Sequence, residues 1–305
     1  MTNPRIEDFR DQNVESPWNG LTFKIIGKTA IHPVEYAKFL IQIGHEPIRP
    51  VLYKPIIGEP RLVLPNVFSY SKYIYQIDGF KGMYSGLAPK LVGVFVEHCT
   101  TWFITNYVKL EKKQILDTEE SESDAWKKWA LNTSKELLST IASNILSYPF
   151  RLISLRIMAQ FVGFEKNYTG VLGSTIVIIR QEGISGLYSG FWPHLIFVSS
   201  HVAIVSLIKH VCSRYLFDPS PIALTMTDLA ASHIATTITY PLNVVSACMT
   251  INDCGLVAGM PPDMPVFGNW LECMKYLSKL DQLHRGSSMF QRNVIYAKPN
   301  ISKMN

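Results

Sequence analysis

Two stretches of the sequence, residues 184–208 and 229–252, contain no Asp, Glu, Lys or Arg. Each is longer than the roughly 20 residues with which an α-helix crosses a hydrocarbon core of about 30 Å. The whole chain points the same way, because 17% of its residues are charged, whereas globular chains average about a quarter. The sequence therefore predicts an all-α membrane protein in which these two stretches cross the bilayer.

Three further segments are candidate spans although they carry charged side chains. They are residues 90–109 with Glu97, residues 137–164 with Arg151 and Arg156, and residues 21–43 with Lys24, Lys28, Glu35 and Lys38. A charge at membrane depth costs at least ~2.5 kcal/mol and normally lines a water-filled cavity. Hydropathy alone would score the last two segments poorly, so their assignment rests on internal repetition.

An ungapped fourteen-residue match connects two parts of the chain. The segment DGFKGMYSGLAPKL at 78–91 returns 104 positions later as EGISGLYSGFWPHL at 182–195. Two similar turns that each open a helix would not account for a match of this length. Self-similarity at a fixed period indicates a repeat architecture.

A second element occurs three times, as a His or Tyr before a Pro inside an apolar stretch. The three pairs are His32-Pro33, Tyr148-Pro149 and Tyr240-Pro241. Proline kinks a helix, and membranes tolerate the kink when neighbouring groups satisfy the freed carbonyl. Each kinked helix is followed by a polar loop and a shorter amphipathic stretch, over residues 66–76, 169–180 and 267–279. The repeated unit is thus a kinked span, a loop, a surface helix, a Gly-rich turn and a second span.

A unit of about a hundred residues with Pro-x-acid-x-x-base and a later acid-Gly and Gly-x-Tyr-x-Gly resembles the mitochondrial carrier signature. Three segments are more closely similar to the mitochondrial carrier homolog family of the outer membrane: LIQIGHEP at 40–47, SLRIMAQF at 154–161, and NDCGL at 252–256 with Gly259, Pro261 and Pro262. The resemblance covers about residues 21–292. It implies a mitochondrial-carrier-like three-repeat helical bundle with amphipathic surface helices.

The resemblance and the repeat divide the chain into five parts. A polar N-terminal segment spans 1–20, repeat 1 spans 21–109, a charged inter-repeat loop spans 110–132, repeat 2 spans 133–217, and a truncated repeat 3 spans 218–305. Within residues 1–20 the acids Glu7, Asp8, Asp11 and Glu15 argue against a cleavable presequence.

The chain departs from a transporter at its gates and at its last helix. A carrier closes one side with ion pairs from all three kinked helices, and repeat 1 has the required Glu35 and Lys38. Repeat 2 has Arg151 and Ser154 at these places, and repeat 3 has Asn243 and Ser246, so a ring of three pairs is not expected. After the Arg285-Gly286 turn too few apolar residues remain for a sixth span. We therefore expect five spans and an interior that is open to lipid on one side.

Helical spacing predicts which side chains line this interior. Polar residues recur on one face of each kinked helix, and Ser and Thr at such positions serve either as groove lining or as small-residue packing between helices. The predicted groove-lining residues are Lys24, Lys28, Glu35, Lys38, Glu97, Asn144, Arg151, Ser154, Tyr240, Asn243 and Ser246. The helix kinks are predicted at Pro33, Pro149 and Pro241.

The resemblance, combined with a groove open to lipid, favours a multi-pass insertase of the mitochondrial outer membrane. Its partners would be membrane lipids and tail-anchored or other α-helical client proteins, a substrate class that the resemblance supplies. The resemblance also implies docking of pro-apoptotic regulators, and the same geometry would scramble phospholipids between leaflets. Two alternatives stay open: a divergent inner-membrane solute carrier that binds an anion with Arg151 and Arg156, and a passive receptor or scaffold.

Several function classes are not favoured by the sequence. It contains no Gly-rich phosphate loop, nucleophile elbow or His spacing suited to a metal, so we expect no catalytic residue, no cofactor and no metal. Lys and Arg are spread along the chain rather than clustered, which disfavours binding to nucleic acid.

Overall fold

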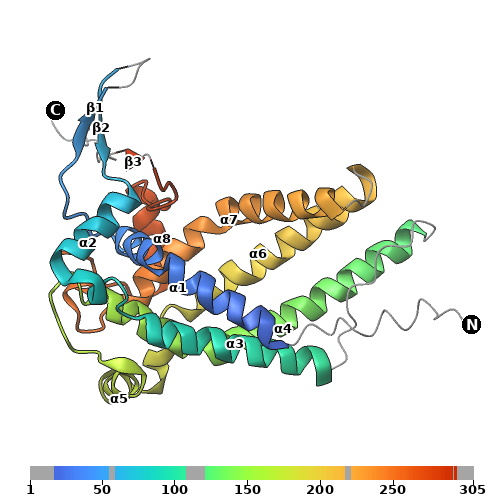
Figure 1. The fold of residues 1–305 in the computed structure, drawn as a ribbon, viewed down its shortest axis with the longest axis horizontal. Coiled ribbons are helices and arrows are strands. Elements are labelled where there is room, and N and C mark those ends of the chain that lie inside the picture. The colour runs from blue at the N-terminus through green and yellow to red at the C-terminus, as the bar shows by residue number, and fades with distance from the viewer. Residues whose placement is uncertain (1–16, 55–58, 108–120, 217–220, 291, 294–305) are drawn as a thin grey trace, which may run out of the picture.

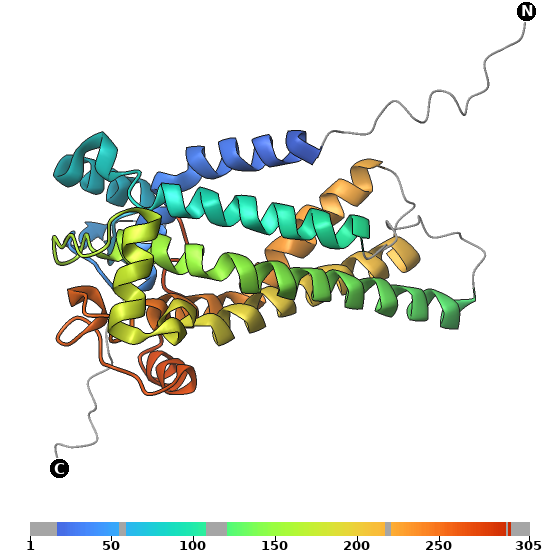
Figure 2. The same cartoon turned by 90° about the horizontal axis from the view of Figure 1, so that it is seen from below.

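Five long helices form the body of the molecule. The computed structural model describes residues 17–54, 59–107, 121–216, 221–290 and 292–293. The long helices are α1 (Pro17–Gln42), α3 (Leu87–Tyr107), α4 (Glu122–Ala159), α6 (Phe191–Val211) and α7 (Pro221–Ile251). They run along the long axis of the molecule and lie close together at one end (Figure 1 and Figure 2). The helical fold and its carrier-like order agree with the sequence prediction.

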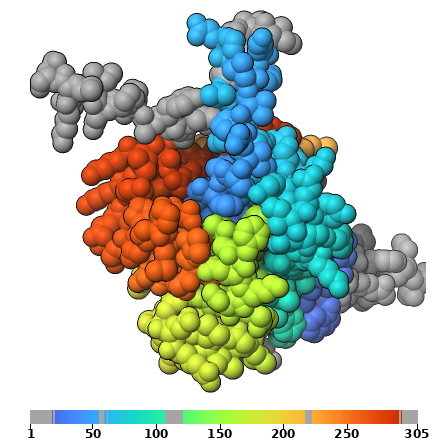
Figure 3. Space-filling view, turned by 90° about the vertical axis from the view of Figure 1, so that its left-hand side faces the viewer, coloured from blue at the N-terminus to red at the C-terminus, as the bar shows by residue number. Residues whose placement is uncertain are grey.

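Three shorter α-helices gather at that end, which we call the short-helix end. They are α2 (Val67–Gly82), α5 (Gly170–Glu182) and α8 (Trp270–Lys279). The side-chain oxygens of Asn66 and Asn269 accept bonds from Ser69 N and Glu272 N and cap α2 and α8. Seen end-on, the three repeats lie around this end, with repeat 1 in blue and cyan, repeat 2 in yellow-green and repeat 3 in orange and red (Figure 3). The predicted surface helices are therefore present in all three repeats.

Short irregular elements and one small sheet complete the described fold. The irregular elements are the 3-10 helices η2 (Ile184–Tyr188) and η4 (Val257–Gly259) and the π-helix η3 (Cys212–Leu216). Strands β1 (Val51–Tyr53), β2 (Arg61–Leu64) and β3 (Arg292–Asn293) pair antiparallel in the order β1-β2-β3. Val63 lies opposite both Val51 and Asn293, so the sheet fastens the end of repeat 3 to repeat 1.

Helix α4 begins earlier than the sequence predicted. Residues 122–132 belong to α4, although the predicted inter-repeat loop extended to residue 132. Glu122 and Asp124 lie in the first turn, where negative charge favours a helix N-terminus. Trp129 Nε1 donates to the Ser206 carbonyl of α6 at 3.2 Å, so tertiary contact also stabilises this extension.

The buried core lies near the short-helix end, and many large apolar side chains on the long helices are exposed. Tyr36, Tyr70, Tyr148 and Ile251 are at most 1% exposed and pack together near the short-helix end. Large apolar side chains farther along the long helices are exposed, among them Phe23, Ile26, Trp102, Phe103, Leu131, Leu138, Leu207, Leu229, Ile234 and Ile238. Extended apolar surface of this kind marks contact with a partner or a membrane.

Two helical segments among the described residues, 184–216 and 222–251, are long and apolar enough to cross a membrane by length and composition alone. They contain the two charge-free stretches of the sequence. Helices α1, α3 and α4 are 26, 21 and 38 residues long, which also suffices to cross a bilayer, and carry the charged side chains already named. Five spans is therefore our proposal for this bundle.

One hydrogen bond recurs in all three repeats and explains the residue before each kink proline. His32 Nε2 lies 2.9 Å from the Ser85 carbonyl oxygen. Tyr148 and Tyr240 donate their hydroxyls to the carbonyls of Ser189 and Arg285 at 2.6 and 2.7 Å. Each bond joins the helix that contains Pro33, Pro149 or Pro241 to the Gly-rich turn of its own repeat. We call these three helices the kinked helices, after the sequence prediction. The Arg285-Gly286 turn is thus the third member of the repeat.

The glycine after each of these carbonyls has a positive φ, at +79° for Gly86, +74° for Gly190 and +70° for Gly286. A Cβ on Gly86 would lie 2.6 Å from the Ser154 carbonyl, and one on Gly190 would lie 2.9 Å from the Ser246 carbonyl. The first two turns therefore pack their backbone directly against the kinked helix of the next repeat, which only glycine permits. At Gly286 the atoms nearest to such a Cβ are side-chain atoms of Ile41, Tyr240 and Gln42, at 3.3 to 3.5 Å.

Candidate functional site

The order of the long helices leaves one place in the bundle without a helix. Helix α3 packs against α1 and α4, and α6 packs against α4 and α7. In both cases the second helix of a repeat stands between two kinked helices. Between α7 and α1 no helix of the described residues takes this place, because the chain after Gly286 continues into β3. We call this side of the bundle the α1–α7 side.

Helices α1 and α7 meet at the short-helix end and separate beyond it. Gln42 Nε2 donates to the Tyr240 hydroxyl at 3.1 Å, and Cys248 Sγ donates to the Gln42 carbonyl at 3.7 Å. The Lys38 ammonium lies 5.3 Å from the centre of the Tyr240 ring, within the range of a cation–π interaction. From this contact the two helices diverge toward the far end (Figure 1). Lys38 and Tyr240 therefore lie at the closed base of the α1–α7 side.

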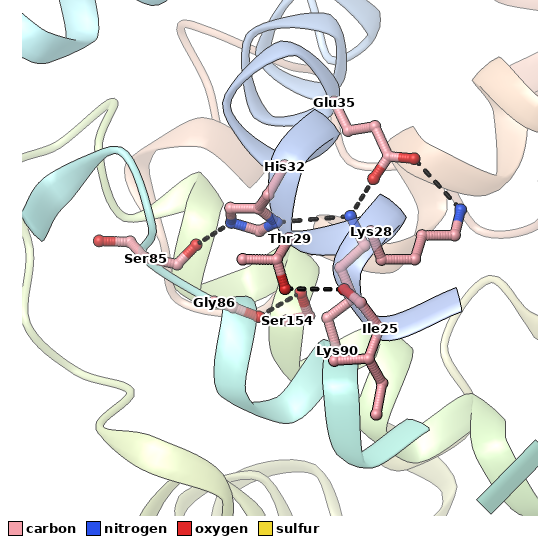
Figure 4. A network of polar contacts seen from close by, with 9 residues as sticks. All are labelled: Ile25, Lys28, Thr29, His32, Glu35, Ser85, Gly86, Lys90 and Ser154. Atoms are coloured by element: carbon pink, nitrogen blue, oxygen red, sulfur yellow. Dashed lines mark hydrogen bonds and ion pairs between the residues drawn. The ribbon is translucent and has the colours of Figure 1, made fainter. Parts of the chain in front are cut away.

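Glu35 is bound by lysines of repeat 1 alone. Its carboxylate accepts from Lys28 on the same helix at 3.2 Å and pairs with Lys90 on α3. Lys90 Nζ lies 3.4 Å from His32 Nδ1, which continues the network to the Ser85 carbonyl (Figure 4). None of the ion pairs among the described residues joins two of the kinked helices α1, α4 and α7. The ring of gate pairs expected in a carrier is not formed in this part of the chain.

Arg151 points into the interior between several helices. Its charge lies close enough to Glu35 on α1, Lys90 on α3 and His194 on α6 to interact with each of them. The guanidinium makes no hydrogen bond or ion pair within the described structure, and its Nε is shielded from solvent without a partner. Arg151 is thus a positive charge among polar neighbours, without a direct hydrogen-bond or ion-pair partner in the described structure.

Asn144 contacts α6, and Asn243 occupies on α7 the position that Arg151 occupies on α4. His194 Nε2 lies 3.2 Å from Asn144 Oδ1, and Asn144 Nδ2 donates to the Thr140 carbonyl at 2.8 Å. Asn144 is therefore held in place by α6 and by its own helix. Asn243 is half-buried and follows Pro241 by two positions, as Arg151 follows Pro149.

Ser154 and Ser246 serve helix packing in this structure. They are 2% and 0% exposed and donate to the carbonyls of Gly86 and Gly190 at 2.7 and 3.2 Å. Both hydroxyls already donate a hydrogen bond where a kinked helix contacts the preceding turn, so we leave these two serines out of the proposed groove. Lys24, Lys28 and Glu97, in contrast, are exposed on α1 and α3.

Arg156 binds a different set of residues from those around Arg151. Its side chain is fully buried and pairs with Glu182 of α5, with 2.8 Å between Nη2 and Oε2. Arg156 Nε also donates to the Thr250 carbonyl at 3.0 Å. The two arginines therefore do not form the joint anion site that the solute-carrier alternative required.

Sequence reasoning missed Lys90, which the structure places beside Glu35. Lys90 precedes Glu97 by seven positions on α3, so helical spacing would have put both on one face. His32 was recognised for its place before Pro33, but its bond to the Ser85 carbonyl was not predicted.

Comparison with known proteins agrees with this architecture. A family model described as mitochondrial carrier protein matches residues 10–114 and 127–220. Mitochondrial carrier homolog 1 of Mus musculus is 35% identical over 290 residues, covering 88% of this chain and 75% of that protein. Mitochondrial carrier homolog 2 of Homo sapiens is 32% identical over 276 residues, covering 87% of this chain and 90% of its own length.

Similarity also extends to a solute transporter. Nicotinamide adenine dinucleotide transporter 2 of Arabidopsis thaliana is 26% identical over 239 residues, covering 75% of this chain and 61% of that protein. The internal repeat, the hydrogen bonds between the kinked helices and the Gly-rich turns, and these sequence similarities all indicate the same family. The chain belongs to the mitochondrial carrier family and is a relative of the mitochondrial carrier homologs.

Proposed function

We propose that this protein is an insertase of the mitochondrial outer membrane for tail-anchored and other α-helical membrane proteins. The observation that supports the proposal most is the α1–α7 side, where the repeat calls for a helix and the described chain supplies none. The outer membrane and the class of clients come from the likeness to the mitochondrial carrier homologs. The protein would act without a catalytic residue or a cofactor.

The proposed groove is the interior reached through the α1–α7 side. Its charged side chains are Lys24, Lys28, Lys38, Lys90, Arg151, Glu35 and Glu97. Asn144, Tyr240 and Asn243 add neutral polar groups. A polar segment that crosses a bare bilayer loses its hydration without compensation. Polar side chains along the path replace part of that hydration and lower the barrier.

The client's apolar helix takes a different route from its polar flank. It slides between α1 and α7 directly into lipid, where its burial is favourable. Only the flank needs the polar side chains. The same open side would let phospholipid head groups cross between leaflets, so we propose lipid scrambling as a second activity of this groove.

Replacing Lys38 by Leu is expected to lower the insertion rate. Lys38 lies at the base of the α1–α7 side with its ammonium over the Tyr240 ring, where it is available to a polar flank. A lost interaction of about 1 kcal/mol, typical for a hydrogen bond, corresponds to about a fivefold lower rate. Initial insertion rates of a tail-anchored client into proteoliposomes measure this effect.

Lys72→Leu is the matched control, because Lys72 is exposed on α2 away from the groove. Both variants should reach normal abundance in the membrane. An unchanged insertion rate for Lys38→Leu at normal abundance contradicts the groove assignment.

A further inference from the structure

Arg151 forms no ion pair with any residue that the structure describes. Arg151 Nε is shielded from solvent and has no hydrogen-bond partner within the described structure. Arg156, one and a half turns further along α4, is paired with Glu182 and bonded to the Thr250 carbonyl. An unpaired charge at membrane depth is costly and normally serves a function. Arg151 is therefore a candidate for binding something that the chain itself does not contain.

The surroundings of Arg151 favour an anion. Glu35 is the acid near it, but Lys28 and Lys90 already bind both oxygens of that carboxylate. His194 is engaged with Asn144, and Lys90 adds a second positive charge nearby. An incoming anion would therefore meet an excess of positive charge in a partly buried site, where electrostatic attraction is stronger than at the surface.

The proposed clients carry a suitable anion at a fixed place. A tail-anchored protein ends with a short polar flank after its transmembrane helix, and that flank always terminates in an α-carboxylate. An ionised carboxylate is among the groups whose transfer into a bilayer costs most. A guanidinium presents parallel N–H donors that match a carboxylate's two oxygens.

We infer that Arg151 binds the C-terminal carboxylate of a client while the polar flank passes through the groove, an inference that rests on the proposed insertase function. Binding at this point compensates the carboxylate where its own hydration has been lost. The side chain of Arg151 is only half-buried, so the carboxylate can reach it and leave again.

The test uses two synthetic clients that differ in one group. Both consist of a 20-residue apolar helix, the length that spans a bilayer, and a flank without Asp, Glu, Lys or Arg. One ends in a free carboxylate and the other in a carboxamide. Each is offered to wild-type protein in phosphatidylcholine liposomes, after subtraction of the rate in protein-free liposomes, and to the Arg151→Gln, Arg151→Lys and Arg180→Gln variants. Arg180 is exposed on α5, so Arg180→Gln is the matched control.

We expect Arg151→Gln to slow insertion of the carboxylate client about tenfold, the loss typical of a hydrogen bond to a charged group. Insertion of the carboxamide client should be the same for wild type and Arg151→Gln. Arg151→Lys should retain part of the carboxylate rate, and Arg180→Gln should retain all of it. Because Arg151→Gln removes a charge without a direct ion-pair partner in the described structure, we expect it to fold normally, and its thermal unfolding midpoint checks this.

Other outcomes separate the inference from the proposed function. If Arg151→Gln slows both clients equally, or neither, Arg151 does not recognise the carboxylate, although insertion itself stands. If the variant slows head-group exchange of fluorescent phospholipids and leaves both clients unaffected, Arg151 serves a lipid phosphate and the inference is overturned. If wild-type protein inserts neither client above the protein-free rate, the proposed function fails as well.

Discussion

Replacing Glu182 by Ala is expected to lower the free energy of unfolding by about 3 to 5 kcal/mol, because it leaves a buried arginine without its ion-pair partner. The side chain of Arg156 is 0% exposed and that of Glu182 is 20% exposed. After the substitution, Arg156 would keep only the neutral Thr250 carbonyl at 3.0 Å and the Tyr168 hydroxyl at 3.5 Å. The thermal unfolding midpoint of the purified protein in detergent micelles measures the loss.

Asp124→Ala provides the comparison for this prediction. The pair between Lys127 and Asp124 is largely exposed, at 77% and 64%, and such pairs contribute about 0 to 1 kcal/mol. A double variant, Arg156→Met with Glu182→Leu, should recover much of the stability, since it removes both charges together. Equal midpoints for Glu182→Ala and Asp124→Ala would show that the buried pair does not hold repeat 2 together.

Supplying a helix on the α1–α7 side, where the described residues place none, is expected to abolish insertion. Helix α3 starts directly after Gly86, and α6 starts directly after Gly190. Gly286 has the same positive φ and lies against Ile41 and Gln42 of α1. A copy of residues 191–211 placed directly after Gly286 would therefore start where a sixth helix belongs and fill the α1–α7 side. Insertion of a tail-anchored client should fall to the rate of protein-free liposomes.

A linker of Gly and Ser of the same length at the same site is the matched control, because it also displaces the residues that follow Gly286. This variant should keep most of the insertion activity. Persistent insertion with the added helix, at normal abundance and with the helix shown to be protected from protease, would mean that clients do not use the α1–α7 side.

Most of the fold could be predicted from the internal repeat in the sequence. The match between 78–91 and 182–195 located the Gly-rich turns, and the three prolines located the kinked helices. Because a short amphipathic stretch follows each kinked helix, α2, α5 and α8 could also be predicted. The Arg285-Gly286 turn looked degenerate in sequence, yet Tyr240 binds its carbonyl as Tyr148 binds that of Ser189. Backbone acceptors of this kind do not depend on side-chain identity, which is why the turn persists.

Long-range pairing and the roles of individual polar residues were harder to predict. Strand β3 pairs with β2 although most of the sequence lies between them. With only two residues, β3 shows no alternation of apolar and polar side chains from which a strand could be predicted. Helical spacing placed Ser154 and Ser246 on the same faces as Arg151 and Asn243. It could not distinguish a hydroxyl at an open surface from one bonded to the carbonyl of a neighbouring turn. Likewise, Lys90 could be recognised as the partner of Glu35 only from the structure, in which α3 lies beside α1.

The central claim is that a carrier fold acts as an insertion groove when its described residues place no helix on the α1–α7 side and form no ring of gate pairs. It is tested most directly by purified protein in liposomes that are offered a tail-anchored client and, in parallel, a labelled metabolite for counter-exchange. We predict that the client acquires a protease-protected transmembrane segment in proportion to the amount of protein, and that no metabolite is exchanged. Metabolite exchange without client insertion would contradict the account and make this protein a solute carrier.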